Sequence, residues 1–327
     1  MGVVYLTQHL FDLALSHFQE GLILAKKIGD DAAKAAIFNN IGNLHKMKGE
    51  YDSAIRFYTD ALLIDEKLHV IVGMINRIRN IGHIQELKTR YDLARDFYRK
   101  SLIKSKELEN PREIDQSLIA LGVLDYKEKK YNDALKNLVR AKLNSEKRKD
   151  WIVLTTIYYN IALVYFDQGK IDDSCYELKK AFKLNRKIKL RDGIMHNKLL
   201  YGKILNKRGN FRVALTQLEE SYQLSQEFQD LRHQGFTLQA MGLVRKNMGE
   251  YNLAIDKFMK ALKIAEDLED FYGQVVLLRN IALCHAKNDN KSSAKSSLNR
   301  ALEFFKLRKI VDPTLEAIIR NNLKKFS

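Results

Sequence analysis

Residues 49–54 read GEYDSA, and the small residue that ends this stretch, Ala54, returns every 40 residues through the chain. The series runs without a slip over eight positions: Ala14, Ala54, Ala94, Ala134, Ser174, Ala214, Ala254 and Ala294. Self-similarity at a period of this size is typical of stacked supersecondary units, each of which packs mainly on its neighbours. The spacing therefore predicts a repeat protein.

One period of the repeat predicts a pair of helices. Its first segment spans residues 32–47 and its second spans residues 51–68, where apolar residues recur at helical rather than alternating spacing. Between the two lies Gly49, and glycine returns at the equivalent positions 169, 209 and 249. Glycine most easily takes the left-handed turn by which a chain leaves a helix. The unit is therefore predicted to be a helical hairpin, and the pattern excludes strands.

Small and aromatic residues predict how the hairpins pack. Small residues recur in the first helix of successive units, at Gly42, Gly82, Gly122, Ala162, Gly202, Gly242 and Ala282. Because Gly within a helix costs about 1 kcal/mol relative to Ala, its repeated use indicates close helix approach. The Ala54 series is predicted to form the opposing surface. Ring residues should fill the space beside each turn, at Phe11, Tyr51, Tyr91, Tyr131, Phe211 and Tyr251.

The repeat resembles the tetratricopeptide repeat (TPR) in its long-helix version. The resemblance rests on Asn40-Ile41-Gly42-Asn43, on the stretch 49–54 and on Ala61-Leu62. Similar repeats occur in Pins-type adaptors, kinesin light chains and bacterial TPR signalling proteins. The resemblance implies an all-α, right-handed superhelical solenoid of antiparallel helix pairs, which works as a protein-binding scaffold.

The chain departs from the TPR pattern at several positions. The family's proline at the end of the second helix is missing in every unit. Ile171 and Lys291 replace the ring residue, and Lys198 occupies a normally large apolar position. These departures are expected to weaken three of the units without removing them.

The repeat predicts one solenoid domain over residues 1–327, made of three parts. Residues 1–28 form an incomplete first repeat, residues 29–309 form seven full hairpins, and residues 310–327 form a capping helix. The pair Asp312-Pro313 is typical of a helix N-cap followed by a first-turn proline.

The shortened first hairpin is predicted to leave apolar side chains exposed. Val3, Val4 and Leu6 lack the front half of a helix to cover them. Homo-oligomerisation through this N-terminal end is therefore a hypothesis.

Composition favours a cytoplasmic, non-catalytic chain. No apolar run approaches the roughly 20 residues that span a bilayer, so no membrane insertion is expected. Cys175 and Cys284 are predicted to be buried free thiols, as in a reducing compartment. The eight histidines lack metal-ligand spacing, and there is no phosphate-binding loop. An enzyme, a metal site and a cofactor are therefore not expected.

The resemblance places the first helices of the hairpins on the concave side of the solenoid. By the helix period, residues three and two before each repeated Gly, and one and four after it, should border a peptide-binding groove. These are Asn39, Asn40, Asn43, Arg79, Asn80, His83, Ile119, Val123, Tyr126, Tyr159, Asn160, Leu163, Phe166, Lys203, Gln239, Lys246, Arg279 and Asn280. The predicted groove runs from polar through apolar and aromatic to basic.

Asparagine recurs in this groove at positions 40, 80, 160 and 280. A carboxamide both donates and accepts hydrogen bonds, so a ladder of them could pair with the main chain of an extended ligand. Alternatively, these side chains only bond neighbouring backbone. Likewise, Tyr126, Tyr159 and Phe166 could anchor a ligand or belong to the core.

The chain is basic, with 56 Lys and Arg against 40 Asp and Glu and a net charge of +16. The excess is concentrated between Tyr176 and Arg208, in a basic patch that includes Lys179, Lys180, Lys183, Arg186, Lys187, Lys189 and Arg191. Several of these recur at helical spacing on a second helix, which predicts a place on the convex side. Such a patch could attract nucleic acid or an acidic protein.

Together these features predict a non-catalytic scaffold that binds an extended or helical peptide segment, of acidic character, in the concave groove. Two alternatives stay open. The chain could be the sensory or regulatory TPR module of a larger bacterial signalling protein. It could also bind nucleic acid through the basic patch.

Overall fold

The fold was derived from a computed structural model, which describes residues 1–7, 10–308 and 312–325. Within these ranges the chain forms helices and no strand. In order they are α1 Gly2–Thr7, α2 Phe11–Ile28, α3 Asp31–Met47, α4 Tyr51–Lys67, α5 Ile71–Leu87, α6 Tyr91–Glu107, α7 Pro111–Lys127, α8 Tyr131–Arg148, α9 Trp151–Asp167, α10 Ile171–Lys187, α11 Arg191–Lys207, α12 Phe211–Glu227, α13 Leu231–Asn247, α14 Tyr251–Asp267, α15 Phe271–Lys287, α16 Lys291–Arg308 and α17 Pro313–Lys325. The helices predicted at 32–47 and 51–68 correspond to α3 and α4 within one residue at each end.

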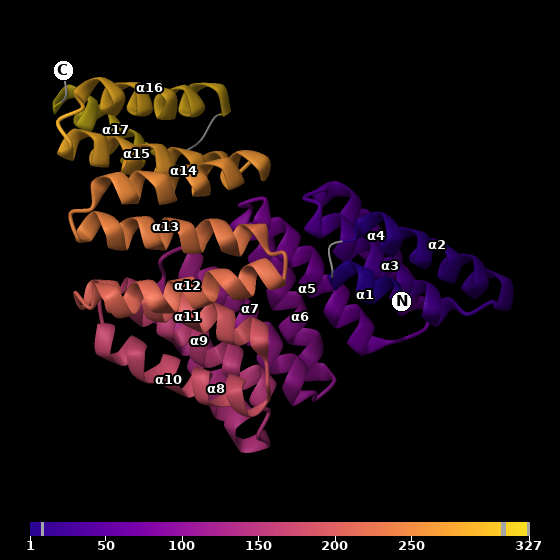
Figure 1. The fold of residues 1–327 in the computed structure, drawn as a ribbon. Coiled ribbons are helices and arrows are strands. Elements are labelled where there is room, and N and C mark those ends of the chain that lie inside the picture. Colours follow the sequence, from indigo (N-terminus) through magenta and orange to yellow (C-terminus); the bar gives the residue numbers. More distant parts are fainter. Residues whose placement is uncertain (8–9, 309–311, 326–327) are drawn as a thin grey trace. The chain divides into compact units, whose positions relative to one another are not determined.

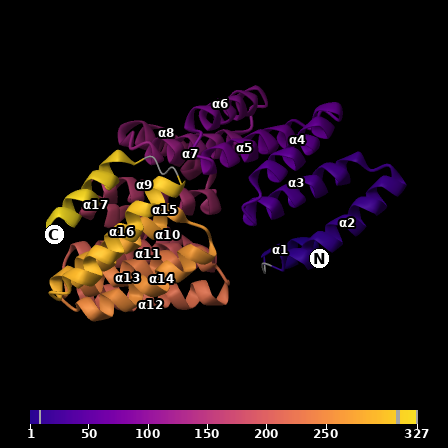
Figure 2. The same ribbon diagram turned by 90° about the horizontal axis from the view of Figure 1, so that it is seen from above.

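The helices fall into two compact units, Met1–Leu184 and Asn185–Ser327, whose boundary lies within α10. In the first unit each helix from α1 to α8 packs on the next helix of the chain, and α7 also contacts α5 and α9. Figure 2 shows α4, α6 and α8 in one layer and α3, α5 and α7 in another. The first helices of successive hairpins are therefore neighbours, as a TPR-type repeat requires.

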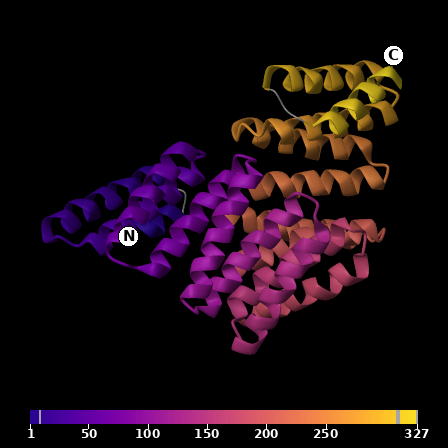
Figure 3. The same cartoon turned by 180° about the vertical axis from the view of Figure 1, so that it is seen from behind.

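The second unit follows the same rule. Helices α11 to α17 each pack on the next, and α11 also contacts α13. In Figure 1 the helices from α12 to α16 lie one above another in chain order, and Figure 3 shows the same stack, orange to yellow, from behind. The all-α architecture of stacked antiparallel helix pairs is therefore confirmed.

Every turn from α2 to α16 contains one residue in the left-handed conformation, and these residues are 20 positions apart. Glycine fills this place at Gly29, Gly49, Gly169, Gly209 and Gly249, with φ between 71° and 80°. At the other turns a residue with a side chain takes it, such as Lys129 at φ 60°. After α3, the N–H of Glu50 donates to the carbonyl of His45 at 2.9 Å, and the N–H of Gly49 donates to that of Lys46 at 3.1 Å. These bonds satisfy the last helical carbonyls, as in a Schellman motif.

The close helix approach predicted from the repeated glycines is confirmed. A Cβ on Gly42 would lie 2.7 Å from Cδ1 of Tyr58, and one on Gly242 would lie 2.5 Å from Cε1 of Phe258. Both ring residues are fully buried. The side chain that packs on each of these glycines therefore belongs to a large residue 16 positions later. In the first case this residue, Tyr58, lies between the fully buried Ala54 and Ala61.

Side-chain N-caps occur mainly at first helices. Asp30, Asn110, Asp150, Asp230 and Asp270 each accept a hydrogen bond from a backbone N–H in the first turn of the helix that follows. Such a cap contributes about 1 kcal/mol to helix stability. The second helices α4, α6, α8, α12 and α14 have no side-chain cap.

The terminal helix begins as predicted. The carboxylate of Asp312 accepts a hydrogen bond from the N–H of Leu315 at 2.9 Å, and Pro313 is the first residue of α17. Helix α17 packs on α16. Residues 310, 311, 326 and 327 of the predicted capping segment lie outside the described residues, as does residue 309 of the seven-hairpin segment.

One prediction for the N-terminal end is wrong. Leu6 is buried in a cluster with Ala14, Phe18, Ile41 and Leu44, because α1 packs on α2 in the place of a full first helix. Val3 and Val4 are exposed, at 51% and 49%. Self-association through this end stays a hypothesis.

Cys175 and Cys284 are buried thiols that form no disulfide, as predicted. Burial raises the pKa of the Cys284 thiol. Among the helices described, none combines the length and the apolar character needed to cross a membrane.

Candidate functional site

Side chains of successive first helices contact one another in the first unit. In the first unit, Nδ2 of Asn80 on α5 donates to Oδ1 of Asn39 on α3 at 2.9 Å. Arg79 on α5 pairs with Glu113 on α7, with 2.9 Å between Nη1 and Oε2. Both contacts join neighbouring first helices, but neither joins residues at equivalent positions of the repeat.

The four asparagines of the predicted ladder differ in their surroundings. Asn80 bonds Asn39, while Nδ2 of Asn160 donates to the carbonyl of Thr156 in its own helix at 2.9 Å. Asn280 is only 4% exposed, which leaves little of it for a ligand. Asn40 is half-buried, and no hydrogen bond of its side chain occurs within the described residues. The four asparagine side chains are therefore not equally available to bind the main chain of a ligand.

The aromatic residues predicted in the middle of the groove are half-buried on α7 and α9. The hydroxyl of Tyr126 donates to Oδ2 of Asp167 at 2.7 Å, which links the two helices. Burial raises the pKa of Tyr159 to about 12. Val123, Leu163 and Phe166 are also half-buried, whereas Ile119 belongs to the buried core and not to the predicted groove.

The basic residues predicted in the second unit include an unusual pair. Lys246 on α13 and Arg279 on α15 are both half-buried, and neither forms an ion pair within the described residues. Burial lowers the pKa of the Lys246 ammonium, and the charge of Arg279 acts in the same direction. The Nε of Arg279 is buried and has no hydrogen-bond partner among the residues that the structure describes. Gln239 and Lys203 lie half-buried on α13 and α11.

A related cation in the first unit, Lys46, is absent from the predicted groove residues. It is half-buried on α3 and has no ion pair within the described part of the chain, and burial lowers its pKa. Burial and the charge of Lys46 also lower the pKa of His83 on α5. Lys46 lies four residues after Gly42, the register position that also selects Tyr126 and Lys246, so the repeat rule itself contains the signal for it.

The basic patch is largely exposed, with several of its charges already paired. Lys179 and Lys183 on α10, and Arg186, Lys187 and Lys189, are exposed. Lys180 pairs with Glu177 at 3.1 Å, and its Nζ lies 4.0 Å from the ring centroid of Tyr176. Arg191 pairs with Glu227. The boundary between the two compact units falls within this segment.

Two histidines meet within the second unit. The rings of His196 on α11 and His233 on α13 are 4.7 Å apart, edge to face. The Nε2 of His233 lies 2.9 Å from Oγ of Ser221, whose hydroxyl donates to the carbonyl of Met195 at 2.8 Å. Burial and the charge of His196 lower the pKa of His233 to about 4. Ser221 is fully buried, so this contact is structural. No group of His, Cys, Asp and Glu in the described ranges is arranged to hold a metal ion.

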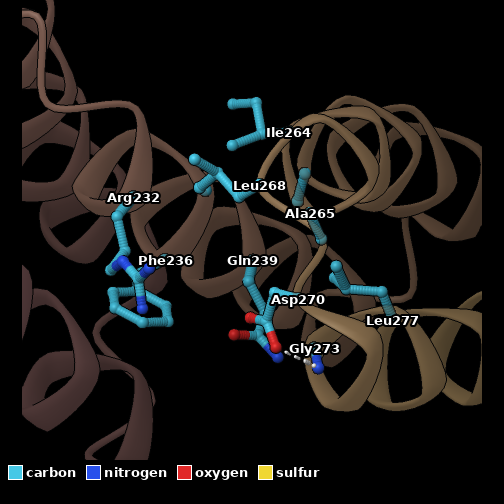
Figure 4. A pocket seen from close by; sticks show the side chains of 11 residues that line it. Arg232, Phe236, Gln239, Ile264, Ala265, Leu268, Asp270, Gly273 and Leu277 are labelled. Carbon is cyan, nitrogen blue, oxygen red and sulfur yellow. Dashed lines mark hydrogen bonds between the residues drawn. The ribbon is translucent and has the colours of Figure 1, made fainter. Parts of the chain in front are cut away.

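A pocket opens within the second unit, between α13, α14 and α15 (Figure 4). It is a small hollow, with a cavity volume of about 40 Å³. Ala261, Ala265 and Leu277 form its buried floor, and Ile264 and Leu268 of α14 contribute further apolar surface. Arg232, Phe236 and the predicted groove residue Gln239 line it from α13.

Comparison with known proteins agrees with the fold. Tetratricopeptide repeat models match residues 1–67, and also residues 155–188 and 237–268. No curated protein sequence matches the chain. With its helical hairpins stacked in chain order, the chain has a TPR-type fold, and the matched segments carry the sequence pattern of that repeat.

Solved structures share this architecture at low sequence identity. The Rap conjugation gene regulator of the plasmid pLS20, solved with its Phr peptide, has 17% identity and a TM-score of 0.69, over 86% of this chain and 76% of that chain. A Rap protein complexed with Competence and Sporulation Factor has 13% identity and a TM-score of 0.66, over 90% and 77%. The quorum sensor NprR from B. thuringiensis, in its apo form, has 18% identity and a TM-score of 0.54, over 86% and 80%.

Proposed function

We propose that this chain is a non-catalytic scaffold that binds an acidic, extended or helical segment of a partner protein along its first helices. In the second unit the charged contact is the pair Lys246 and Arg279. The observation that carries the proposal is that these two cations are half-buried near one another without an acidic partner in the described residues. Buried charges in proteins are normally paired, so an unpaired couple of like sign suits an anionic ligand.

The first-helix face supplies the rest of the binding surface. Half-buried polar groups such as Asn40 and Gln239 offer donors and acceptors, and Tyr159 and Phe166 offer apolar contact. The solved structures of similar fold include a regulator bound to a peptide, which supports a protein-interaction role. A role as the regulatory module of a larger signalling protein would use the same face, with the bound segment as its signal.

A pull-down from cell lysate tests the proposal, with the chain immobilised and its partners identified by mass spectrometry. The double variant Lys246→Glu, Arg279→Glu should retain its partner about tenfold less, because charge-assisted hydrogen bonds contribute about 1.5–3 kcal/mol. Lys263→Glu is the matched control, since Lys263 is exposed on α14. It should retain the partner as the unaltered chain does.

Nuclease-treated and untreated lysates separate this proposal from nucleic-acid binding by the basic patch. A protein partner that is lost in the double variant and indifferent to nuclease supports the scaffold. Retention of the same partner by both variants would contradict it. Capture of nucleic acid that Lys179→Glu, Lys183→Glu abolishes would move the function to the basic patch.

A further inference from the structure

One polar contact, termed a rung, recurs between successive first helices at the same place in the repeat. It joins the residue four positions after the repeated small residue of one first helix to the residue five positions after that of the next first helix. Three rungs are formed by side chains that pair or hydrogen-bond: Glu86 Oε1 and Lys127 Nζ at 2.5 Å, the Tyr126 hydroxyl and Asp167 Oδ2 at 2.7 Å, and Asn206 Oδ1 and Asn247 Nδ2 at 3.0 Å. Polar pairing is therefore the ordinary state of this place in the repeat.

At two other junctions the rung lacks an acceptor. Lys46 on α3 and Lys246 on α13 hold its first position, and the residues at its second position, Leu87 on α5 and Lys287 on α15, have no acceptor side chain. Both Lys46 and Lys246 are half-buried, and neither forms an ion pair within the described residues. Because a charge removed from water normally has a partner of opposite charge, each of these lysines marks an incomplete rung.

The incomplete rung at Lys46 is in the same register as the rungs that are formed. Asn39 on α3 and Asn80 on α5 are hydrogen-bonded at 2.9 Å and, like the partners of each rung, lie 41 positions apart. Seven residues further along a helix is close to two full turns, so Lys46 and Leu87 lie on the faces that carry this pair. The acceptor is therefore missing because of the residue type at position 87, and not because the helices are shifted.

Two further hydrogen-bond donors lie beside Lys46. Asn43 precedes it by three residues and so shares its face of α3. The Oδ1 of Asn43 accepts from the hydroxyl of Tyr58 at 2.8 Å, while its Nδ2 has no hydrogen bond within the described ranges. His83 lies one turn before Leu87 on α5, and it is half-buried. Burial lowers the pKa of His83, and the charge of Lys46 acts in the same direction, which places the two side chains near one another.

The carboxylate of this chain that acts on His83 is already engaged. Glu86 raises the pKa of His83, and Lys127 lowers it. The Glu86 side chain is only 4% exposed, pairs with Lys127 and accepts from the hydroxyl of Tyr98 at 2.5 Å. The cluster of Lys46, Asn43 and His83 therefore has donors and positive charge in excess, which suits an anion from outside the chain.

We propose that a carboxylate of the bound protein segment completes the rung at Lys46, with the Lys46 ammonium as its charged partner and Asn43 and His83 as flanking donors. The inference rests on the proposed protein-binding function, and it gives the first unit an anion site of its own beside the pair Lys246 and Arg279. A carboxylate accepts several hydrogen bonds at once, and those from a charged donor are the strongest. Protonation of His83 adds a second positive charge, so binding should be tighter at about pH 5.5 than at about pH 7.5, while a glutamate carboxylate is still ionised.

A carboxylate built into the chain tests the incomplete rung without any ligand. Leu87→Glu offers an acceptor to Lys46, and Leu87→Gln is the matched control of similar length without charge. Both variants lose the same apolar contacts of Leu87 with the cluster around Tyr58 and Ile84. At about pH 7.5, where His83 is neutral, Leu87→Glu should unfold at a higher urea concentration than Leu87→Gln. This difference should vanish when Lys46→Gln is added to both. A difference that persists without Lys46 would overturn the proposed register.

Binding is tested with acetyl-hexaglutamate amide as the acidic probe and with the ring resonances of His83 as the local readout. The probe should raise the pKa of His83, because a bound carboxylate favours the protonated ring. Lys46→Gln should weaken the affinity read at His83 about tenfold. Lys27→Gln is the control, since it removes the same charge from an exposed place on α2 and should leave the affinity unchanged.

A second peptide identifies the source of the carboxylate. Acetyl-hexaglutamine with a free C-terminus offers only a terminal carboxylate, whereas the blocked hexaglutamate offers only side-chain carboxylates. Binding of either peptide that depends on Lys46 supports the site and tells which carboxylate it takes. If neither peptide moves the His83 resonances at millimolar concentration, or if Lys46→Gln binds as the unaltered chain does, the proposal is overturned.

The pull-down separates failure of this site from failure of the proposed function. If a peptide binds through Lys46 but no protein partner is retained from lysate, the anion site stands and the protein-binding function fails. If Lys246→Glu, Arg279→Glu loses a protein partner while Lys46→Gln retains both that partner and the peptides, the protein-binding function stands and the site at Lys46 fails.

Discussion

The carboxylate of Asp65 occupies the space that a side chain on Gly73 would need: a Cβ on Gly73 would lie 2.4 Å from Oδ2 and 2.5 Å from Cγ of Asp65. The same exchange recurs 120 residues later, where a Cβ on Gly193 would lie 2.6 Å from Nδ2 of Asn185. Where the earlier position is Ser145, the later one is Val153. At these junctions between hairpins, a larger side chain on one helix is therefore matched by a smaller residue on the next helix.

Gly73→Ala should therefore lower the free energy of unfolding by about 1–3 kcal/mol, the usual effect of overpacking a full site. Asp65→Ser should lower it as well, because Arg77 Nε, 3.2 Å from Oδ2 of Asp65, loses its partner. Since the clash needs both side chains, the double variant should be more stable than the sum of the single effects predicts, by about 1 kcal/mol or more. Urea unfolding of the four proteins measures this, and strict additivity would contradict it.

The architecture followed from the sequence because its signals repeat. One small residue every 40 positions and one helical apolar pattern per segment are enough to place the helix pairs. The turns were predicted only at Gly49 and at its three equivalents, Gly169, Gly209 and Gly249. The other residues in the left-handed conformation, such as Lys129, are not of a type that indicates this conformation. They are recognised only from the structure, in which left-handed residues are spaced 20 positions apart.

Lys129→Gly should raise the free energy of unfolding by about 1 kcal/mol, because a residue with a side chain at φ 60° pays for the left-handed conformation. Lys129→Ala is the control, since it removes the charge and keeps the strain. The reverse change, Gly169→Ala, should destabilise by a similar amount, because a Cβ there would meet nothing within 4 Å and only the backbone conformation matters. The midpoints of denaturant unfolding of the three variants test this. If Lys129→Ala raised stability as much as Lys129→Gly, the left-handed conformation would not be the cause.

The candidate site was less predictable than the fold. The register rule brought Asn39 to Asn80 and selected Lys246 and Arg279, but it could not tell that Ile119 and Asn280 are buried. Side-chain burial depends on packing by neighbouring hairpins, which one repeat does not specify. The pocket between α13, α14 and α15 could not be predicted either, because it depends on how three helices meet.

Acid should weaken the second unit through His233. Its pKa is about 4 in the folded chain, against about 6.5 for an unfolded histidine. Between these values the unfolded chain binds a proton that the folded chain excludes, so stability falls as pH drops from about 6.5 to about 4. The loss attributable to His233 is about 3 kcal/mol.

The variant His233→Gln keeps a polar side chain beside Ser221 and removes this titration. Urea unfolding at several pH values should give a flatter profile for the variant over the same range. Some slope should remain, because burial also lowers the pKa of the neighbouring His196. Equal profiles for the variant and the unaltered chain would show that His233 is protonated as readily in the fold as outside it.

If Lys246 and Arg279 serve to bind a ligand, their charges should lower the free energy of unfolding of the protein without that ligand. Its two charges are half-buried and unpaired within the described residues, and residues kept for binding often lower stability. Lys246→Met keeps most of the aliphatic length and removes the charge, so it should raise the free energy of unfolding by about 1 kcal/mol. Lys263→Met on α14 is the control, because an exposed lysine should change stability by less than about 0.5 kcal/mol. Urea unfolding in low salt gives both values. A destabilised Lys246→Met would mean that the ammonium is stabilised within the fold itself, and the argument for an acidic ligand at this pair would lose its basis.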